Sequence, residues 1–352
     1  MKYKFIILII LIVGFFAMKN IFIQNKNKDL KIKYDSLEKK GIILSNRLDL
    51  PLPSKELNYQ PGHWRRTVVD DPHVIKQGNK YRMLLSGYGS TFDLYPDTDN
   101  IWSLGEATAP HPKGPWTISN NDNPLLVSPG WKGGWGGGHL VSSMYIFDPK
   151  EKKGKIIYQC STGEPENGAK IGRTDDGYPN IGTELFFGKA NTIADPYLVH
   201  DGKYYHLFYS KKVKNNWQTW KRKSSKWKGL ANDFSAKCIV PLGGSSSVTK
   251  YNGVWYLVYS AWYDDENEFD YKKHKNKLYL LKSKDLENWT PEFNGKPIFE
   301  SYDDYDKFGA QDPCLFIENN VMYIYYSVIQ DPKNNGETNT SIGLVTFKLT
   351  NK

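Results

Sequence analysis

Runs of alternating apolar and polar residues, separated by short turns, follow one another from about Trp64 to the end of the chain. Alternation with a period of two residues is typical of β-strands that bury one face. The turns between the runs are rich in Gly, Asn, Asp and Pro, and no amphipathic helical pattern of useful length interrupts them. The pattern therefore predicts an all-β domain.

One hairpin pattern recurs along this domain. The stretches DDPHVIKQGNKYRMLLSG, ADPYLVHDGKYYHLFYS and QDPCLFIENNVMYIYYS each place Asp-Pro about seven residues before a Gly or Asn turn, and Tyr-rich alternation follows. Counting back from the turn gives Asp71, Asp195 and Asp312, and the same count from Gly253 gives Ser246. Because the first interval is about twice the others, a further copy is expected near residue 140.

Repeats of about 60 residues that supply four short strands each are typical of β-propeller blades. The distance from Asp71 to Asp312 is about four such steps, so the sequence predicts a five-bladed β-propeller over residues 59–352. The first strand of each blade lines the central channel, and we expect Asp71, Asp195 and Asp312 to meet at one mouth of it. The alternative is that each Asp only opens its strand and stabilises a turn.

The N-terminal segment has a different character. Lys2 and Lys4 precede the uncharged apolar run Phe5–Met18, so residues 1–23 are predicted to be a signal peptide or a membrane anchor. The polar residues 24–58 are predicted to be a linker with at most one short helix. The domain is accordingly expected to be exported to the periplasm or the extracellular space, with its N-terminal segment at a membrane if that segment is retained.

Composition narrows the choice of partners. The net charge is +9, and the lysines are scattered along the chain. The densest stretch, KKVKNNWQTWKRKSSKWKG, is interpreted as a solvated face and not as a nucleic-acid site. The charge supports at most a modest attraction to an acidic polysaccharide or an anionic membrane. Cys160, Cys238 and Cys314 lack metal-ligand spacing and are interpreted as small buried residues, with one disulfide as the alternative.

The hairpin repeats, together with GEATAPHPKGPW and LLKSKDLENWTPEFNGKPIF, resemble glycoside hydrolase family 43 and its five-bladed relatives, which include arabinanases, xylosidases, arabinofuranosidases and anhydrogalactosidases. The likeness spans residues 64–350. It implies that Asp71 is the general base and that Asp195 orients the catalytic acid and tunes the pKa of that acid. Hydrolysis with inversion also needs an acid on the opposite face of the sugar, about 6.5–9.5 Å from the base.

The sequence departs from the family pattern at this acid. The family places a Glu at the head of the fourth blade, where Ser246 stands in the predicted register. A serine cannot protonate a glycosidic oxygen at neutral pH, so the acid lies elsewhere or has been lost. The candidates for a relocated acid, each with an ordinary loop or turn role as its alternative, are Glu164, Glu166, Asp264, Asp265, Glu266 and His139.

Sugar-binding residues are predicted beside the channel. Side chains alternate along a strand, so His73 should share the side of Asp71 while Asp70 faces away. The Gly-rich stretch SPGWKGGWGGGH offers flat tryptophan faces to a sugar ring, although packing on the rim of the domain is the alternative. The predicted substrate-binding set is His73, Trp64, Trp131, Trp135, His139, Ser246 and Asp312.

The sequence thus predicts a glycoside hydrolase that acts on a poly- or oligosaccharide outside the cytoplasm. No cofactor is expected to be required, and a structural cation in the central channel is a further expectation. Two alternatives stay open at this point. One is a non-catalytic carbohydrate-binding propeller, which the missing Glu favours; the other is a glycan phosphorylase or transferase with the same cleft.

Overall fold

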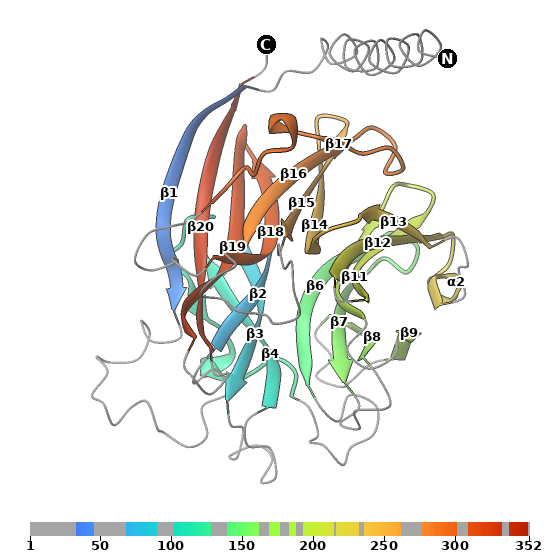
Figure 1. The fold of residues 1–352 in the computed structure, drawn as a ribbon. Coiled ribbons are helices and arrows are strands. Elements are labelled where there is room, and N and C mark those ends of the chain that lie inside the picture. Colours follow the sequence, from blue (N-terminus) through green and yellow to red (C-terminus); the bar gives the residue numbers. More distant parts are fainter. Residues whose placement is uncertain are drawn as a thin grey trace, which may run out of the picture.

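The structure is a computed structural model that describes residues 33–45, 68–89, 101–127, 139–161, 169–176, 183–187, 193–214, 216–231, 236–261, 276–300, 309–332 and 338–350. These residues form β-strands, one short helix, α2 (Trp227–Ala231), and two 3₁₀ turns, η2 (Asn120–Asp122) and η3 (Phe293–Gly295) (Figure 1). The all-β prediction is confirmed. The predicted signal or anchor lies outside the described residues, and none of the helices described has the length and apolar character needed to cross a bilayer.

The strands pair antiparallel into sheets that follow the order of the chain. One sheet contains β6 (Leu140–Asp148), β7 (Lys153–Ser161), β8 (Ala169–Asp175) and β9 (Thr183–Phe187). The next contains β10 (Ile193–His200), β11 (Tyr205–Val213), β12 (Asn216–Ser224) and β13 (Lys237–Val240). A third contains β14 (Gly244–Tyr251), β15 (Val254–Ala261), β16 (Lys277–Ser283) and β17 (Thr290–Pro291). The predicted copy near residue 140 is therefore present as the hairpin of β6 and β7.

The remaining strands belong to an eight-stranded sheet. Its members are β2 (Val68–Gln77), β3 (Lys80–Gly89), β4 (Ile101–Ala109), β5 (Thr117–Ile118), β18 (Ala310–Glu318), β19 (Val321–Pro332), β20 (Thr338–Thr350) and β1 (Lys33–Ser45). A single parallel pair, Val68 with Thr340, joins its two halves. We call β2, β6, β10, β14 and β18 the inner strands. They contact one another in this order, and β18 in turn contacts β2.

Each inner strand contains a β-bulge near its start, where the pairing with the next strand shifts. The first bulged residue has a positive φ, which costs Asp less than most other residues with a side chain. Pro72, Pro196 or Pro313 follows the Asp in three of the bulges, and proline suits an unpaired position because it has no N–H to satisfy. The recurring Asp-Pro is therefore a bulge signal. The positive φ angles are 52° at Asp71, 50° at Ser142, 51° at Asp195, 48° at Ser245 and 46° at Asp312.

At four of the inner strands, the backbone N–H of the bulge is satisfied by the neighbouring hairpin. A side chain on the second strand of the preceding hairpin accepts this hydrogen bond. A buried hydrogen bond of this kind fixes both the bulge and the contact between sheets, since an unpaired buried N–H is costly. The acceptors are Ser327 Oγ for Asp71 (3.1 Å), Ser86 Oγ for Ser142 (3.0 Å), Gln159 Oε1 for Asp195 (3.1 Å) and Ser210 Oγ for Ser245 (2.7 Å).

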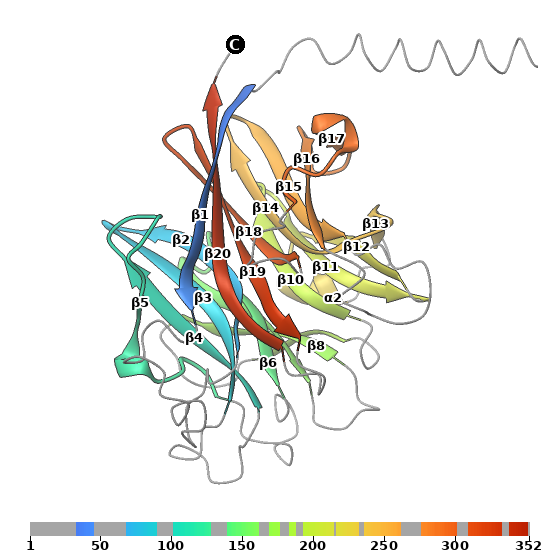
Figure 2. The same cartoon turned by 60° about the vertical axis from the view of Figure 1, so that its left-hand side comes forward.

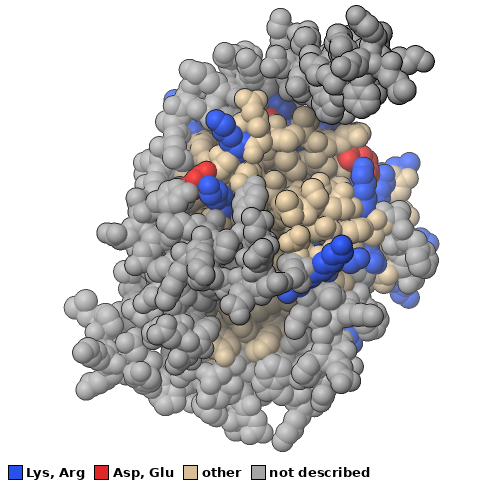
Figure 3. Space-filling view, in the orientation of Figure 1, with Lys and Arg blue, Asp and Glu red and all other residues tan. Residues whose placement is uncertain are grey.

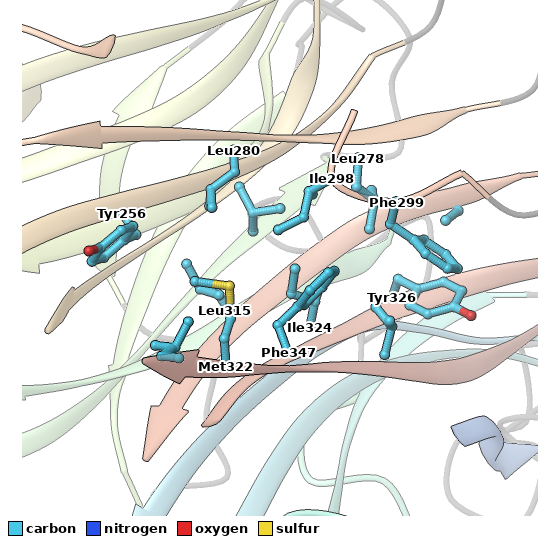
Figure 4. Close-up of a cluster of buried hydrophobic side chains, with 14 of the residues drawn as sticks. Tyr256, Leu278, Leu280, Ile298, Phe299, Leu315, Met322, Ile324, Tyr326 and Phe347 are labelled. Atoms are coloured by element: carbon cyan, nitrogen blue, oxygen red, sulfur yellow. The ribbon is translucent and has the colours of Figure 1, made fainter. Parts of the chain in front are cut away.

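Apolar side chains fill the spaces between adjacent sheets. In Figure 4, Leu280 and Leu278 of β16 face Leu315, Met322 and Ile324 of β18 and β19. These side chains are almost fully buried, as the two-residue alternation requires. Similar clusters lie at the other sheet boundaries. Of the three cysteines, Cys160 and Cys314 are buried, and no disulfide joins any two of them.

Strand β1 differs from the linker that the sequence predicts for residues 24–58. It pairs antiparallel with β20 along its whole length, from Lys33 opposite Thr350 to Ser45 opposite Ser341. Figure 2 shows the two strands side by side. The physical reason is the free edge of β20, which presents unpaired N–H and C=O groups to any segment that reaches it. A polar segment can pair with this edge, because the backbone hydrogen bonds do not require an alternation of apolar and polar side chains.

We expect Ser210→Ala to lower the free energy of unfolding by about 1–3 kcal/mol, because it leaves the N–H of Ser245 buried without its acceptor. Urea denaturation measures the change. Ser225→Ala, at an exposed position, is the matched control and should change stability by less than about 0.5 kcal/mol. Equal stabilities of the two variants would contradict the role assigned to this hydrogen bond.

Candidate functional site

The bulges of the inner strands surround a small cavity of about 40 Å³. All five first bulged residues line it, and so do the residues that follow them. Side chains that are 50 or more positions apart in the sequence thus reach one point because the five bulges occur at the same place in the strands. The lining consists of Asp71, Pro72, His73, Ser142, Ser143, Met144, Asp195, Pro196, Tyr197, Ser245, Ser246, Asp312 and Pro313.

Asp71 is held firmly at this cavity. Its Oδ2 accepts hydrogen bonds from Ser86 Oγ (2.7 Å) and from the backbone N–H of Ser142 (3.0 Å). Burial, helped by the nearby charge of Asp195, raises the pKa of Asp71 to about 6, while the hydrogen bonds from Ser86 and Ser142 oppose the rise. A carboxylate with a pKa close to neutrality is well suited to exchange a proton with a water molecule.

Asp195 is bonded on both of its oxygens by serines from neighbouring inner strands. Ser142 Oγ donates to Oδ1 (3.1 Å), and Ser245 Oγ donates to Oδ2 (2.8 Å). Both serines occupy the bulge position that Asp occupies in the other three strands. The alternation of Asp and Ser around the cavity therefore supplies donors to a carboxylate that would otherwise lie among carboxylates alone.

Asp70 and Asp312 complete a group of three carboxylates. One oxygen each from Asp70, Asp71 and Asp312 lies within 4.8 Å of the others. Burial first, and then the charges of neighbouring aspartates, raises the pKa values of Asp70 and Asp312 well above the ordinary range. The prediction that Asp70 faces away from the channel is wrong, because the bulge between Asp70 and His73 interrupts the alternation on which it was based.

The register of the fourth inner strand needs a second correction. Its bulge lies between Gly244 and Ser247 and its positive φ is at Ser245, so Ser245 and not Ser246 corresponds to Asp71. The count of seven runs to Asn252, which also has a positive φ, and not to Gly253. Ser246 corresponds to the proline of the other repeats. It lines the cavity as predicted, and its buried hydroxyl has no hydrogen-bond partner among the described residues, like that of Ser143.

The two histidines behave differently. His73 lines the cavity as predicted, is almost fully buried and packs edge-on against Tyr197. Burial lowers the pKa of His73 to about 4, so it is neutral at pH 7. His139 does not belong to the cavity lining, and its Nδ1 accepts the backbone N–H of Trp102 (3.2 Å). Burial also lowers its pKa to about 4, which argues against its use as a proton donor at neutral pH.

Several predicted site residues lie outside the described residues: Trp64, Trp131, Trp135, Glu164, Glu166, Asp264, Asp265 and Glu266. Strands β7 and β15 end at Ser161 and Ala261, just before the two groups of acidic candidates in the chain. Both strand ends lie beside the bulges. Val141 and Gly244 directly precede the first bulged residues of their strands, and they pair with Gln159 near the end of β7 and with Ser260 near the end of β15. The polypeptide thus leaves both strands at the end of the domain where the cavity lies.

Sequence reasoning missed four contributors to the site, namely Asp70, Ser86, Ser142 and Ser245. Ser86 belongs to a recurring signal that the sequence contains: the second strand of most repeats has a Ser after two apolar or aromatic residues, as in LLS, FYS, VYS and YYS. Ser142 and Ser245 could be found only by aligning each hairpin on its bulge. Because these two strands have a serine where the others have Asp, the Asp-Pro motif is absent from them.

Comparison with known proteins gives matches at the level of structure. No protein-family model matches the sequence, and no curated protein matches it. Among solved structures, a thermostable family-43 glycoside hydrolase matches with a TM-score of 0.60 at 17% identity, over 81% of this chain and 94% of that chain. The α-L-arabinofuranosidase from Podospora anserina, in complex with cellotriose, matches with a TM-score of 0.58 at 13% identity, over 88% and 96%. An exo-1,5-α-L-arabinanase from a bovine ruminal metagenomic library matches with a TM-score of 0.54 at 18% identity, over 81% and 95%. The chain therefore has the fold of these glycoside hydrolases, and the resemblance to family 43 is confirmed as a likeness of fold.

The carboxylate group should make stability depend on pH. A carboxyl whose pKa is raised on folding stabilises the protein below its unfolded pKa, and this contribution is lost as the pH rises through the folded value. For Asp71 this interval runs from about 4 to about 6, and Asp70 and Asp312 extend the loss to higher pH. Asp312→Asn should therefore be more stable than the wild type at pH 8, by on the order of 2 kcal/mol, and similar to it at pH 4.

Urea denaturation of both proteins at pH 4, 6 and 8, with a chelator present to remove divalent cations, measures this difference. Stability curves that run parallel over the whole pH range would contradict the assignment of the raised pKa values to this group.

Proposed function

We propose that this protein is a glycoside hydrolase that acts on a poly- or oligosaccharide outside the cytoplasm, with the Asp71 cavity as its catalytic centre. The observation that carries the proposal is Asp71 itself. It is a carboxylate held by two hydrogen bonds at the cavity, with a pKa of about 6, in the fold of glycoside hydrolases. The cellotriose bound to the Podospora anserina arabinofuranosidase supports a carbohydrate as the substrate class, without identifying the sugar.

In the proposed reaction, Asp71 accepts a proton from the water that attacks the anomeric carbon, and the bond from that carbon to the leaving oxygen breaks. Hydrogen bonds from Ser86 and from the N–H of Ser142 orient Asp71 for this step. Asp195, held by Ser142 and Ser245, supplies the fixed negative charge that keeps a nearby acid protonated. A second group must protonate the leaving oxygen.

The acid is proposed to come from the segments that follow β7 or β15. Asp312 is a poor choice, since its oxygen lies within 4.8 Å of an Asp71 oxygen, whereas hydrolysis with inversion needs about 6.5–9.5 Å between acid and base. The wider spacing leaves room for the attacking water and the sugar. Glu164, Glu166, Asp264, Asp265 and Glu266 directly follow strands that end at the cavity end of the domain, which supports an inverting arrangement with one of them.

We also propose that the domain is a five-bladed propeller. The three four-stranded sheets provide three blades, and β2 to β5 provide a fourth. Strands β18, β19 and β20 provide three strands of a fifth blade, which β1 completes from the other end of the sequence. The ring of contacts among the inner strands and the five equivalent bulges support this count.

A cation in the channel is a further part of the proposal. The residues fit such an ion, because three carboxylate oxygens within 4.8 Å of one another are hard donors of the kind that Ca²⁺ prefers. Asp70, Asp71 and Asp312 would hold it, and its charge would offset the repulsion among them. The ion is assigned a structural role; because Asp71 would be one of its ligands, the ion would also lower the pKa of this base.

One observation favours a second candidate, a propeller that binds carbohydrate without cleaving it. The bulge position of the fourth inner strand carries Ser245, and a serine cannot protonate a glycosidic oxygen at neutral pH. The two functions share the cavity and differ in whether an acid is present.

We expect Asp71→Asn to lower the rate of glycan hydrolysis by about 10²–10⁴-fold while oligosaccharide binding persists, because the amide keeps the shape of the carboxylate but accepts no proton. Release of reducing sugar from a glycan panel and calorimetric binding measure the two properties. Asp201→Asn, in a turn far from the cavity, is the control and should keep wild-type activity. Wild-type turnover by Asp71→Asn would rule out its role as base; a wild type that binds but cleaves nothing would leave the binding function.

The acid can be identified by its dependence on the leaving group. Glu164→Gln, Glu166→Gln, Asp264→Asn, Asp265→Asn and Glu266→Gln are compared on the natural glycan and on an activated aryl glycoside. The variant that lacks the acid should fail on the glycan but keep much of its activity on the aryl glycoside, whose leaving group needs little protonation. If all five variants lose both activities in parallel or lose neither, none of these residues is the acid.

A further inference from the structure

The hairpin turns that follow the inner strands form a second surface, which the proposed function does not use. Each turn comes about seven residues after its bulge, which places it about 20–25 Å from the cavity at the usual rise of a strand. The segments after β12 and β16 reach the same end. Trp227 Nε1 donates to Asp148 before the β6–β7 turn, and Ser283 pairs with Trp255 beside the β14–β15 turn. We call this end of the domain the turn face.

Each of the four sheets contributes exposed lysines to the turn face, either from a hairpin turn or from a segment that follows a strand. None of them forms an ion pair with another described residue, so their charges are available to an external partner. Figure 3 shows Lys and Arg side chains at the right-hand edge of the molecule, over the region where Figure 1 labels β12, β13 and α2. The lysines are Lys80, Lys152, Lys203, Lys226, Lys228 and Lys284.

The exposed acidic residues of the turn face, in contrast, are already bound within the protein. Glu151 pairs with Lys155 and Arg173. Asp201 bonds His206 (2.8 Å) and accepts two backbone N–H groups of its own turn. Asp285 accepts the backbone N–H groups of Glu287 and Asn288, each at 2.8 Å. Among the described residues, the six exposed lysines outnumber these three acids, so the face carries a net positive charge toward an approaching partner.

An exposed aromatic side chain lies on the same face. Phe147, directly before the β6–β7 turn, is 54% exposed, and only one other large hydrophobic residue in the described ranges is comparably exposed. Exposed Lys152 follows it in the turn, and exposed Lys153 begins β7. Lysines around a protruding aromatic ring are typical of proteins that contact a membrane interface, where the ring enters the headgroup region and the lysines meet anionic lipids.

The chain also enters the described domain at the turn face. Lys33, the first residue of β1, pairs with Thr350, and the N–H of Leu349 donates to the carbonyl of Asn320 in the β18–β19 turn (2.7 Å). Figure 1 shows the start of β1 beside the end of β20. Upstream in the sequence, Lys26, Lys28 and Lys31 separate this point from the apolar run Phe5–Met18. An anchor placed by that run would hold the turn face, and not the cavity, toward the bilayer.

We propose that the turn face lies against an anionic membrane surface, so that the cavity opens away from the membrane toward polysaccharide. Three independent observations favour lipid over an acidic polymer: the protruding Phe147, the position of β1, and the basic apolar sequence before it. The orientation does not depend on whether the cavity hydrolyses or only binds sugar. Failure of the hydrolysis experiments would leave it unaffected.

The test is lysine footprinting of the full chain in vesicles of phosphatidylcholine, with or without phosphatidylglycerol. Acetylation by an amine-reactive reagent is quantified by mass spectrometry. Lys80, Lys152, Lys226 and Lys284 should react about fivefold more slowly when the anionic lipid is present, and high salt should remove the difference. Lys212, near the end of β11, and Lys214, directly after it, are exposed at the cavity end, since both follow the bulge-level Ser210. They are internal controls and should not change.

A matched pair of variants tests the contribution of the face. Lys152→Gln with Lys226→Gln should weaken the protection of Lys80 and Lys284, whereas Lys212→Gln with Lys214→Gln removes the same charge and should not. Equal effects of the two variants, or protection of Lys212 and Lys214 by the anionic vesicles, would overturn the orientation. Adding polygalacturonate to the neutral vesicles tests the other partner: protection by this polymer without protection by anionic lipid would assign the face to an acidic polysaccharide and refute the membrane proposal.

Discussion

The hydrogen bond between a bulged N–H and a side chain of the neighbouring hairpin is the constraint on which the rest of the structure depends. It is seen at four of the inner strands, with Ser327, Ser86, Gln159 and Ser210 as acceptors. The bulge turns the following residues toward one point, and the hydrogen bond to the acceptor side chain joins each hairpin to the next. Without the bulge, alternation would send adjacent side chains to opposite faces, and the cavity would lose part of its lining. The same few atoms thus set both the contact between sheets and the position of the carboxylates.

This constraint gathers buried carboxylates that repel one another. Folding brings Asp70, Asp71 and Asp312 together and raises their pKa values, which costs stability at neutral pH. Serines at the remaining bulge positions moderate the repulsion by donating to Asp195 and, through the backbone, to Asp71. A protein that only needed a stable channel would be better served by apolar side chains. The cluster is therefore most simply explained by chemistry performed on, or an ion held by, the carboxylates.

The two ends of the inner strands have opposite electrostatic character for a reason that lies in the strands themselves. Each strand begins with the bulge and its Asp or Ser, and ends in a turn where Lys, Asn and Gly are frequent. Because all five run outward from the same cavity, the acidic and basic positions separate into two faces. Among the described residues near the turns, the exposed lysines outnumber the exposed acids, so the net charge there is positive.

The sequence by itself determined the all-β character, the recurring hairpins and the convergence of Asp71, Asp195 and Asp312, because two-residue alternation and Asp-Pro before a turn are local signals. It also placed His73 and Ser246 at the cavity. Only the tertiary structure decided that Asp70 joins the cluster, that Ser245 holds the fourth bulge position, and that β1 pairs with β20. Asp70 was missed because a bulge shifts the register of side chains by one residue and leaves no mark in the composition. Ser245 was missed because a serine in place of Asp removes the Asp-Pro motif. Pairing between chain ends depends on which strand edge remains free, and a sequence read in order does not contain that information.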